Sequence, residues 1–165
     1  MKPTVSSIHF CPIKSLSFQK ANSLIIKKNI GIEGDRIFAF SRGLNELDAK
    51  RVEKNPIERN LINFLTLKNS PFLNKYDFKY KNKTISILKE NKEVCSYHID
   101  NKESLSKKLL ELEPNLPGPT YLLKNQLYPF YDTTNSSSVL NTISLINLNT
   151  VKDLNQKIGK KIEFE

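Results

Sequence analysis

Two short stretches of this chain place cations beside small polar groups at the ends of predicted strands. Lys14 and Ser15 follow Pro12, which lacks an amide donor and therefore favours the end or the edge of a strand. Asp35 and Arg36 follow a glycine-containing corner and open an aromatic strand. A guanidinium offers a two-pronged donor and an ammonium a compact charge, so Lys14, Ser15 and Arg36 together would suit a phosphate group.

Each stretch also has a simpler interpretation. Lys14 is one of many lysines in a chain of net charge +9, and by itself it would be a solvated surface charge. Asp35 and Arg36 would form an ordinary surface ion pair, which contributes little to stability. In either case we expect Asp35 to orient the loop or Arg36 rather than to take part in chemistry.

The cysteines and histidines do not indicate a metal centre or a catalytic base. Cys11 and Cys95 lie far apart and outside any Cys-x-x-Cys pattern, so we expect reduced thiols rather than a zinc site or a disulfide. His9 and His98 lie in alternating, strand-like segments without the orienting partner that a catalytic base needs. The sequence therefore predicts no catalytic residue and no metal ligand in this chain.

The strongly basic composition raises the possibility of an anionic partner. A net charge of +9 and a pI near 9.5 suit nucleic acid, a phosphate-bearing cofactor or an acidic membrane surface. The lysines are scattered, however, and no apolar run approaches the roughly 18 residues that span a membrane. The first seven residues also lack a secretory signal. We therefore expect a cytoplasmic protein with neither a nucleic-acid nor a membrane partner.

Alternating residues and turn signals predict many short strands, which favours a β-barrel or a strongly curved sheet at the N-terminus. The last three strands before residue 100 should form a meander. Predicted strands cover 5–13, 23–28, 35–41, 47–51, 64–67, 76–80, 84–88, 93–99, 120–124 and 142–146.

Three helices and one boundary complete the predicted organisation. Leucines at spacings of four and three predict an amphipathic helix over 101–112. A similar apolar pattern predicts another that begins at Asn149 or Thr150 and ends at Gly159. Between them, the Pro-rich segment 113–119 is the best internal boundary. A short helix should also begin where an Asn cap precedes a Pro, near residue 55.

These features together resemble a known family. The run 12–15 (Pro-Ile-Lys-Ser), followed by 31–36 (Gly-Ile-Glu-Gly-Asp-Arg), is similar to the N-terminal β-barrel domain that precedes MOSC domains. The run 143–155 resembles the opening of a MOSC domain, which is named for the C-terminal domain of molybdenum cofactor sulfurase. The resemblance implies an α+β, β-rich fold, with a barrel-like domain over 1–118 and the incomplete start of a MOSC β-barrel domain over 119–165.

The resemblance also implies a function, which is binding of the molybdenum cofactor (molybdopterin). In complete form, oxidoreductases of this family reduce N-hydroxylated or related small substrates with electrons from a partner protein. The family roles carry over to Lys14, Ser15 and Arg36, which would contact the pyranopterin and its phosphate. On a poorer local match they also carry over to Asn141 and Thr142, in the loop before the MOSC strand.

The chain departs from the family pattern at two places. Cys11 stands where the family usually has Tyr, and the family's metal-ligating cysteine follows an Arg-Phe-Arg-x-Asn motif that is expected beyond Glu165. We therefore expect cofactor binding to be weakened or absent, and no catalytic activity, in this chain by itself. Whether the protein is an enzyme stays open at this point.

Two alternatives come from other functional classes. One is a sulfur-carrier or cofactor-sulfurase-associated module, since MOSC domains also occur fused to pyridoxal-phosphate-dependent sulfurases; no Schiff-base lysine motif is visible here. The other is a basic nucleic-acid-binding module, which predicts steeply salt-dependent binding of oligonucleotides. The lack of clustered cations with interleaved aromatic residues counts against it.

Overall fold

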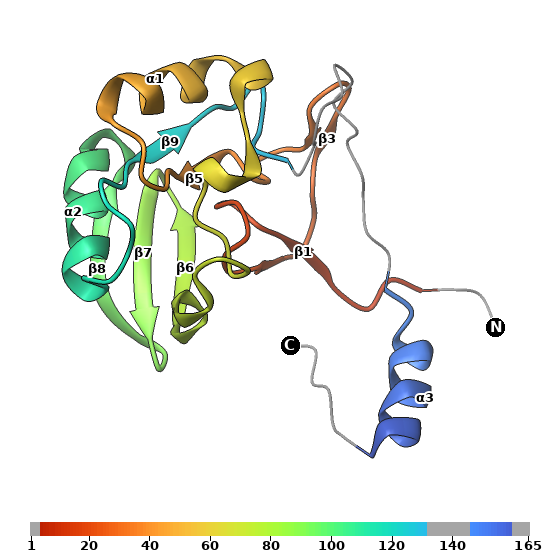
Figure 1. Cartoon of the computed structure of the whole chain (residues 1–165). Helices are drawn as coiled ribbons and strands as arrows, with labels where there is room; N and C mark the ends of the chain where they lie inside the picture. Colours follow the sequence, from red (N-terminus) through yellow and green to blue (C-terminus); the bar gives the residue numbers. More distant parts are fainter. Residues whose placement is uncertain (1–3, 132–145, 160–165) are drawn as a thin grey trace.

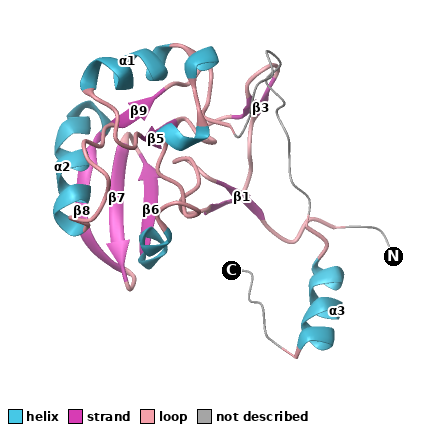
Figure 2. Ribbon diagram, in the orientation of Figure 1, coloured by secondary structure: helices cyan, strands magenta, loops and turns pink. Residues whose placement is uncertain are grey.

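The computed structural model describes residues 4–131 and 146–159, which form a mixture of helices and small antiparallel sheets (Figures 1 and 2). The elements are β1 (Ile8–Phe10), β2 (Gln19–Ala21), β3 (Ile26–Lys27), β4 (Gly31–Ile32), β5 (Phe38–Phe40), α1 (Glu46–Lys54), η1 (Pro56–Glu58), η2 (Leu61–Asn63), η3 (Pro71–Lys75), β6 (Tyr76–Lys81), β7 (Thr84–Lys89), β8 (Lys92–His98), η4 (Ile99–Asn101), α2 (Lys102–Leu112), β9 (Leu122–Lys124) and α3 (Leu148–Ile158).

The strands pair in four separate sheets. Three are two-stranded, β1 with β2, β3 with β4 and β5 with β9, and the fourth is the meander β6–β7–β8. The mixture of helix and strand expected from the sequence is confirmed. Within the described residues no barrel closes and strands do not outweigh helices, so the β-barrel and the β-rich class stay predictions.

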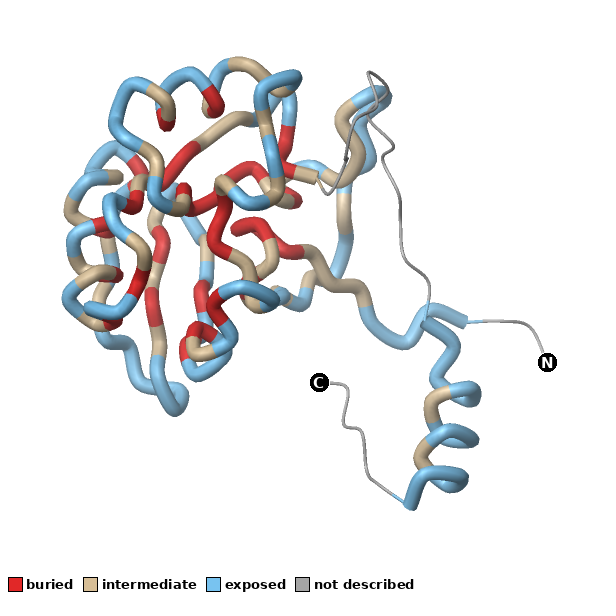
Figure 3. The backbone as a smooth tube through the Cα atoms, in the orientation of Figure 1, coloured by how far each residue is buried: buried red, intermediate tan, exposed pale blue. Residues whose placement is uncertain are grey.

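β5 and its partner β9 lie between two hydrophobic cores. Because alternate residues of a strand point to opposite faces, Phe38 and Phe40 enter the larger core, whereas Ala39 enters the smaller one. β9 pairs antiparallel with β5 and follows the same rule, with Leu122 in the larger core and Leu123 in the smaller. α1 and α2 both contact β9, so the buried pair of strands β5 and β9 lies between them (Figure 3).

The meander and α2 contribute to the larger core. Phe78, Ile85 and Ile87 point inward from β6 and β7. Leu105 and Leu109 cover them from α2, which lies along β8 in Figure 1. The three predicted strands and the helix over 101–112 are confirmed, with boundaries shifted by only a residue or two.

Two side chains, rather than a further strand, cover the outer edge of β6. The Ser17 hydroxyl donates to the carbonyl of Tyr76 (3.3 Å) and accepts from the amide of Phe78 (2.9 Å). The Gln19 side chain donates to the carbonyl of Tyr80 (3.3 Å) and accepts from its amide (2.8 Å). The unpaired backbone groups of this edge are thus satisfied by polar side chains.

α1 overturns one prediction. The alternation over 47–51 predicted a short strand, but the structure has a helix over Glu46–Lys54. Asn45 caps the helix, because its side-chain oxygen accepts a first-turn amide hydrogen (2.8 Å). Ala49 and Val52, three residues apart, are the buried positions, so the relevant period is that of a helix and not of a strand.

The other predicted elements have mixed outcomes. A cap at Asn55 does begin a short helix, η1, because its side chain accepts from the backbone amide of Ile57 (3.3 Å). The strand predicted over 64–67 is reduced to an isolated bridge. α3 is capped by Asn147, two or three residues before the predicted caps Asn149 and Thr150, and it ends at Gly159 (φ 61°) as predicted. None of the α3 residues is buried, as Figure 3 shows.

The chain on both sides of the predicted domain boundary at residue 118 shares these cores. β9 pairs with β5, and Phe130 lies in the smaller core with Ala39 and Phe64. Residues up to 131 therefore pack with the segment assigned to the first domain. The division into 1–118 and 119–165 stays a prediction, and the strand predicted over 142–146 lies almost wholly outside the described residues.

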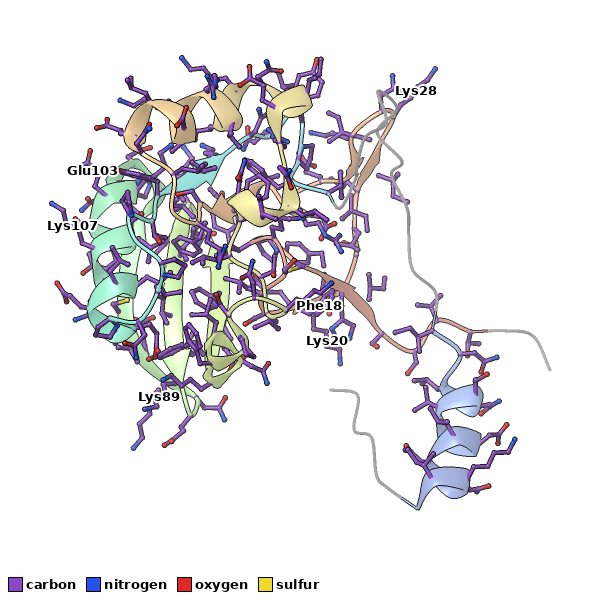
Figure 4. The ribbon with its side chains drawn as sticks, in the orientation of Figure 1. Phe18, Lys20, Lys28, Lys89, Glu103 and Lys107 are labelled. Atoms are coloured by element: carbon purple, nitrogen blue, oxygen red, sulfur yellow. The ribbon has the colours of Figure 1, made fainter. Side chains whose placement is uncertain are left out.

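The charged surface is spread over several elements. In Figure 4, Lys28 lies at the tip of the β3–β4 hairpin, Lys89 at the β7–β8 turn and Lys107 on the outer side of α2. Each of these side chains points into solvent from a different part of the fold. No helix in the described part of the chain has the length and apolar character needed to cross a membrane.

Candidate functional site

The Lys14–Ser15 corner begins where the chain leaves β1. The amide of Lys14 donates to the carbonyl of Phe38 (2.8 Å), which ties the corner to β5. The turn is closed by a hydrogen bond from the amide of Leu16 to the carbonyl of Ile13 (3.1 Å). Ser15 takes the left-handed conformation inside this turn (φ 56°), an uncommon conformation for a residue with a Cβ atom.

The Asp35–Arg36 corner is joined to the first corner through Cys11. One carboxylate oxygen of Asp35 accepts the amide hydrogen of Cys11 (2.7 Å), and the other pairs with the guanidinium of Arg36. The amide of Arg36 donates in turn to the carbonyl of Cys11 (2.6 Å). Gly34 allows the preceding tight turn with φ 84°, in the region that favours glycine. Asp35 thus holds its loop and Arg36 by hydrogen bonds, as expected, and that it takes no part in chemistry stays a prediction.

Both cations meet the dipeptide Phe130–Tyr131, which lies just before the undescribed segment. The ammonium of Lys14 donates to the carbonyl of Phe130 (3.2 Å). The amide of Phe130 donates to the carbonyl of Arg36 (2.8 Å), and the guanidinium of Arg36 lies 5.7 Å from the centre of the Tyr131 ring. The structure therefore brings the two sequence motifs into contact with one short segment.

The two cations differ in exposure. Lys14 is 1% exposed, so its interpretation as a solvated surface lysine is wrong. Its ammonium contacts the Phe130 carbonyl and lies 5.8 Å from the centre of the Phe64 ring, a cation–π arrangement. The Arg36 side chain is 30% exposed, although its partner Asp35 is buried. The pair is therefore more than an ordinary surface contact, and the Arg36 side chain stays partly exposed.

Tyr131 anchors the shared segment to the β3–β4 turn. Its hydroxyl donates to the carbonyl of Ile30 (2.8 Å). Burial raises the pKa of Tyr131, the negative charge of Asp35 raises it further, and Arg36 opposes both. The phenol is therefore protonated at neutral pH and serves as a hydrogen-bond donor.

Neither cysteine is prepared for nucleophilic or ligand chemistry. The Cys11 thiol is buried and donates to the carbonyl of Ile13 (2.9 Å). Burial raises the pKa of Cys11 to about 11, so the thiol is protonated at neutral pH. Cys95 is half-buried in β8, and burial raises its pKa as well. In the described parts of the chain, no three His, Cys, Asp or Glu side chains lie close enough to hold a metal ion.

Arg59 was not predicted from the sequence, yet it contacts the residues that directly precede Phe130. One of its guanidinium nitrogens donates to the carbonyls of Tyr128 (2.6 Å) and Pro129 (3.1 Å). No spacing rule could have connected residues 69 positions apart. The run 128–131 (Tyr-Pro-Phe-Tyr) carries no pattern that refers to residue 59.

Three of the five predicted cofactor-binding residues can thus be placed. Lys14 and Arg36 both contact the segment Phe130–Tyr131, and Ser15 follows Lys14 in the sequence. Asn141 and Thr142 lie outside the described residues. The placed residues fit the phosphate end of a cofactor, because they combine a hydroxyl, a partly open guanidinium and a buried positive charge. No protein-family model, no curated protein and no solved structure matches this chain.

Proposed function

We propose that this protein binds the molybdenum cofactor (molybdopterin) as a member of the MOSC family, with Lys14, Ser15 and Arg36 holding the cofactor's phosphate. The single observation that carries the proposal is the meeting of the two motifs. The side chain of Lys14 donates to the Phe130 carbonyl (3.2 Å), while the carbonyl of Arg36 accepts from the Phe130 amide (2.8 Å). Lys14 and Arg36, 22 positions apart in the sequence, thereby contact the same residue.

The three residues have different roles in this proposal. Arg36 contacts the phosphate directly, because Asp35 holds one side of its guanidinium while 30% of the side chain stays exposed. Ser15, next to Lys14 in the sequence, adds a hydroxyl donor from a turn in which it takes the left-handed conformation. Lys14 is buried and supplies positive potential from behind, an effect that is strong where water is excluded.

The cofactor itself supplies the redox chemistry when bound. In complete form such a protein reduces N-hydroxylated or related small substrates, with electrons from a partner protein, while the residues above hold and orient the cofactor. The proposal includes the barrel-like fold of the N-terminal part, a MOSC domain start after residue 118, a contribution from Asn141 and Thr142, and a cytoplasmic location.

The experiment that tests this function is a titration of the purified chain with molybdopterin, followed by the fluorescence of the pterin. We expect Arg36→Ala to weaken binding about tenfold or more, since charge-assisted hydrogen bonds contribute about 1.5–3 kcal/mol. Lys14→Met should also weaken binding, because it removes a buried positive charge. Ser15→Ala, which changes no charge, should weaken binding less. Lys20→Ala is the matched control, because Lys20 is exposed and lies on β2. Equal affinity in all four variants and the parent would remove the site assignment.

The structure does not favour either of the two alternative functions. An oligonucleotide-binding module would bind generic nucleic acid with a steep salt dependence and would ignore molybdopterin. The exposed lysines labelled in Figure 4 project from separate elements, which does not favour that function. A sulfur carrier would need a reactive thiolate, and burial of Cys11, with a pKa of about 11, does not favour that role.

A further inference from the structure

Arg59 joins two segments that are far apart in the sequence. Its Nε and Nη2 atoms donate to the carbonyls of Val52 and Glu53 in the last turn of α1 (3.1 Å each). Its Nη1 atom donates to the carbonyls of Tyr128 (2.6 Å) and Pro129 (3.1 Å). Four of the five N–H groups of a guanidinium are thus committed to carbonyl oxygens: one on Nε, two on Nη1 and one on Nη2.

The surroundings of Arg59 hold it in this place. The guanidinium carbon lies 4.1 Å from the centre of the Phe130 ring, so the cation stacks on the aromatic residue of the same segment. The carbonyls of Val52 and Glu53 form the negative end of the α1 dipole, which favours a cation there. Burial lowers the pKa of Arg59 to about 10, while Glu53 opposes the shift, so the side chain remains charged at neutral pH.

We propose that Arg59 is a positioning residue for the cofactor site, because it holds the segment Tyr128–Tyr131 in place over Lys14 and Arg36. The inference rests on the proposed function. Arg59 acts through the segment and does not touch the ligand, since its donors already serve carbonyls. The segment in turn presents the Phe130 carbonyl to Lys14 and the Tyr131 ring to Arg36.

The position of the segment sets the geometry of both cations. If the segment moved, Lys14 would lose the Phe130 carbonyl, and Arg36 would lose both its hydrogen bond with the Phe130 amide and the face of Tyr131. A lysine at position 59 would retain the charge but not the fork, because one ammonium cannot reach carbonyls on two separate segments in a fixed plane. The guanidinium group, and not merely its charge, is therefore the required feature.

The test uses the full chain and molybdopterin, at a temperature at which circular dichroism shows every variant to be folded. We expect Arg59→Ala to bind about tenfold more weakly, Arg59→Lys to recover little, and added ethylguanidinium to restore part of the affinity of Arg59→Ala. Arg51→Ala is the matched control, because it removes the same charge from an exposed position on α1. Loss of global stability alone would lower the melting temperature without changing the affinity of the folded protein.

A second measurement does not require the cofactor. Burial raises the pKa of Tyr131 above its ordinary value of 10.0, so release of the segment in Arg59→Ala should lower it towards that value. The titration is followed by ultraviolet absorbance, with Tyr131→Phe used to assign the change. If the parent binds molybdopterin and Arg59→Ala binds equally well with an unchanged Tyr131 titration, the inference is overturned. If the parent does not bind molybdopterin at all, the proposed function is overturned instead.

Discussion

The meander with α2 and the corner around Lys14 and Arg36 are held together by different kinds of contact. On the meander side, Leu105 and Leu109 pack on inward-facing strand residues that lie nearby in the sequence. At the corner, buried polar groups bind backbone carbonyls far away, such as that of Phe130, 116 positions from Lys14. Apolar packing follows a periodic pattern that is visible in the sequence. The polar contacts at the corner form only when distant parts of the chain come together in the fold.

The largest expected effect comes from the apolar side. Leu109→Ala should destabilise the protein by about 2–5 kcal/mol, because a fully buried leucine is lost and a cavity remains. Urea denaturation measures the change. Lys107→Ala, on the solvent side of the same helix, should change stability by no more than about 0.5 kcal/mol. A loss below about 1 kcal/mol for Leu109→Ala would mean that α2 is not essential to this core.

A smaller loss is expected when the corner is broken. Asp35→Ala should cost about 1–3 kcal/mol, because the buried amide of Cys11 and the guanidinium of Arg36 both lose their acceptor. Asp35→Asn separates the two contributions, since its amide oxygen can still accept from Cys11 but carries no charge. If Asp35→Ala cost more than Leu109→Ala, polar contacts and not apolar packing would dominate the stability of this chain.

How well the sequence predicted the fold follows the same division. The leucine spacing in 101–112 and the alternation in the meander predicted α2 and its three strands, because each pattern is complete within one element. α1 was mistaken for a strand because residues 47–51 follow a turn signal and begin with alternating apolar and polar residues. In the helix, however, the apolar Leu47 is 79% exposed. An Asn that precedes a short segment suits a turn as well as an N-cap, and only the structure shows that Asn45 caps α1.

The candidate site was predicted less completely than the fold. Local patterns identified Lys14, Ser15 and Arg36 as residues that could bind one anion together. In the structure, Lys14 and Arg36 both contact the segment Phe130–Tyr131. Local patterns could not show that Lys14 is buried, because its burial depends on Phe64 and on Phe130. Arg59 escaped notice for the same reason, since its partners at 128–129 have no sequence signal that refers to it.

A third prediction tests the helix on which Arg59 rests. Asn45→Ala should destabilise the protein by about 1 kcal/mol, because a first-turn amide of α1 loses its side-chain acceptor. Asn45→Ser retains a capping oxygen and should be close to the parent. Thermal denaturation followed by circular dichroism measures both. No difference between the alanine and serine variants would contradict a capping role for Asn45.

The smallest expected effect concerns Glu113, a buried carboxylate beside the meander. Glu113 is 7% exposed, accepts from the hydroxyl of Tyr76 (2.7 Å) and pairs with Lys75 (2.5 Å). Burial alone would raise the pKa of Glu113, but the hydrogen bonds from Lys75 and Tyr76 and the charge of Lys75 outweigh it and lower the pKa below its ordinary 4.5. The folded state therefore favours the ionised form.

The pH dependence follows from the sign of that shift. The stabilisation from ionised Glu113 is fully present above pH 4.5 and is lost as the pH falls through the lowered pKa, where the folded state also takes up the proton. Glu113→Gln removes this titration but keeps an acceptor for Tyr76. The difference in unfolding free energy between the parent and Glu113→Gln should therefore be constant near neutral pH and should change in the variant's favour below pH 4.5. A constant difference throughout the acid range would show that the meander side depends on Glu113 only for a neutral hydrogen bond.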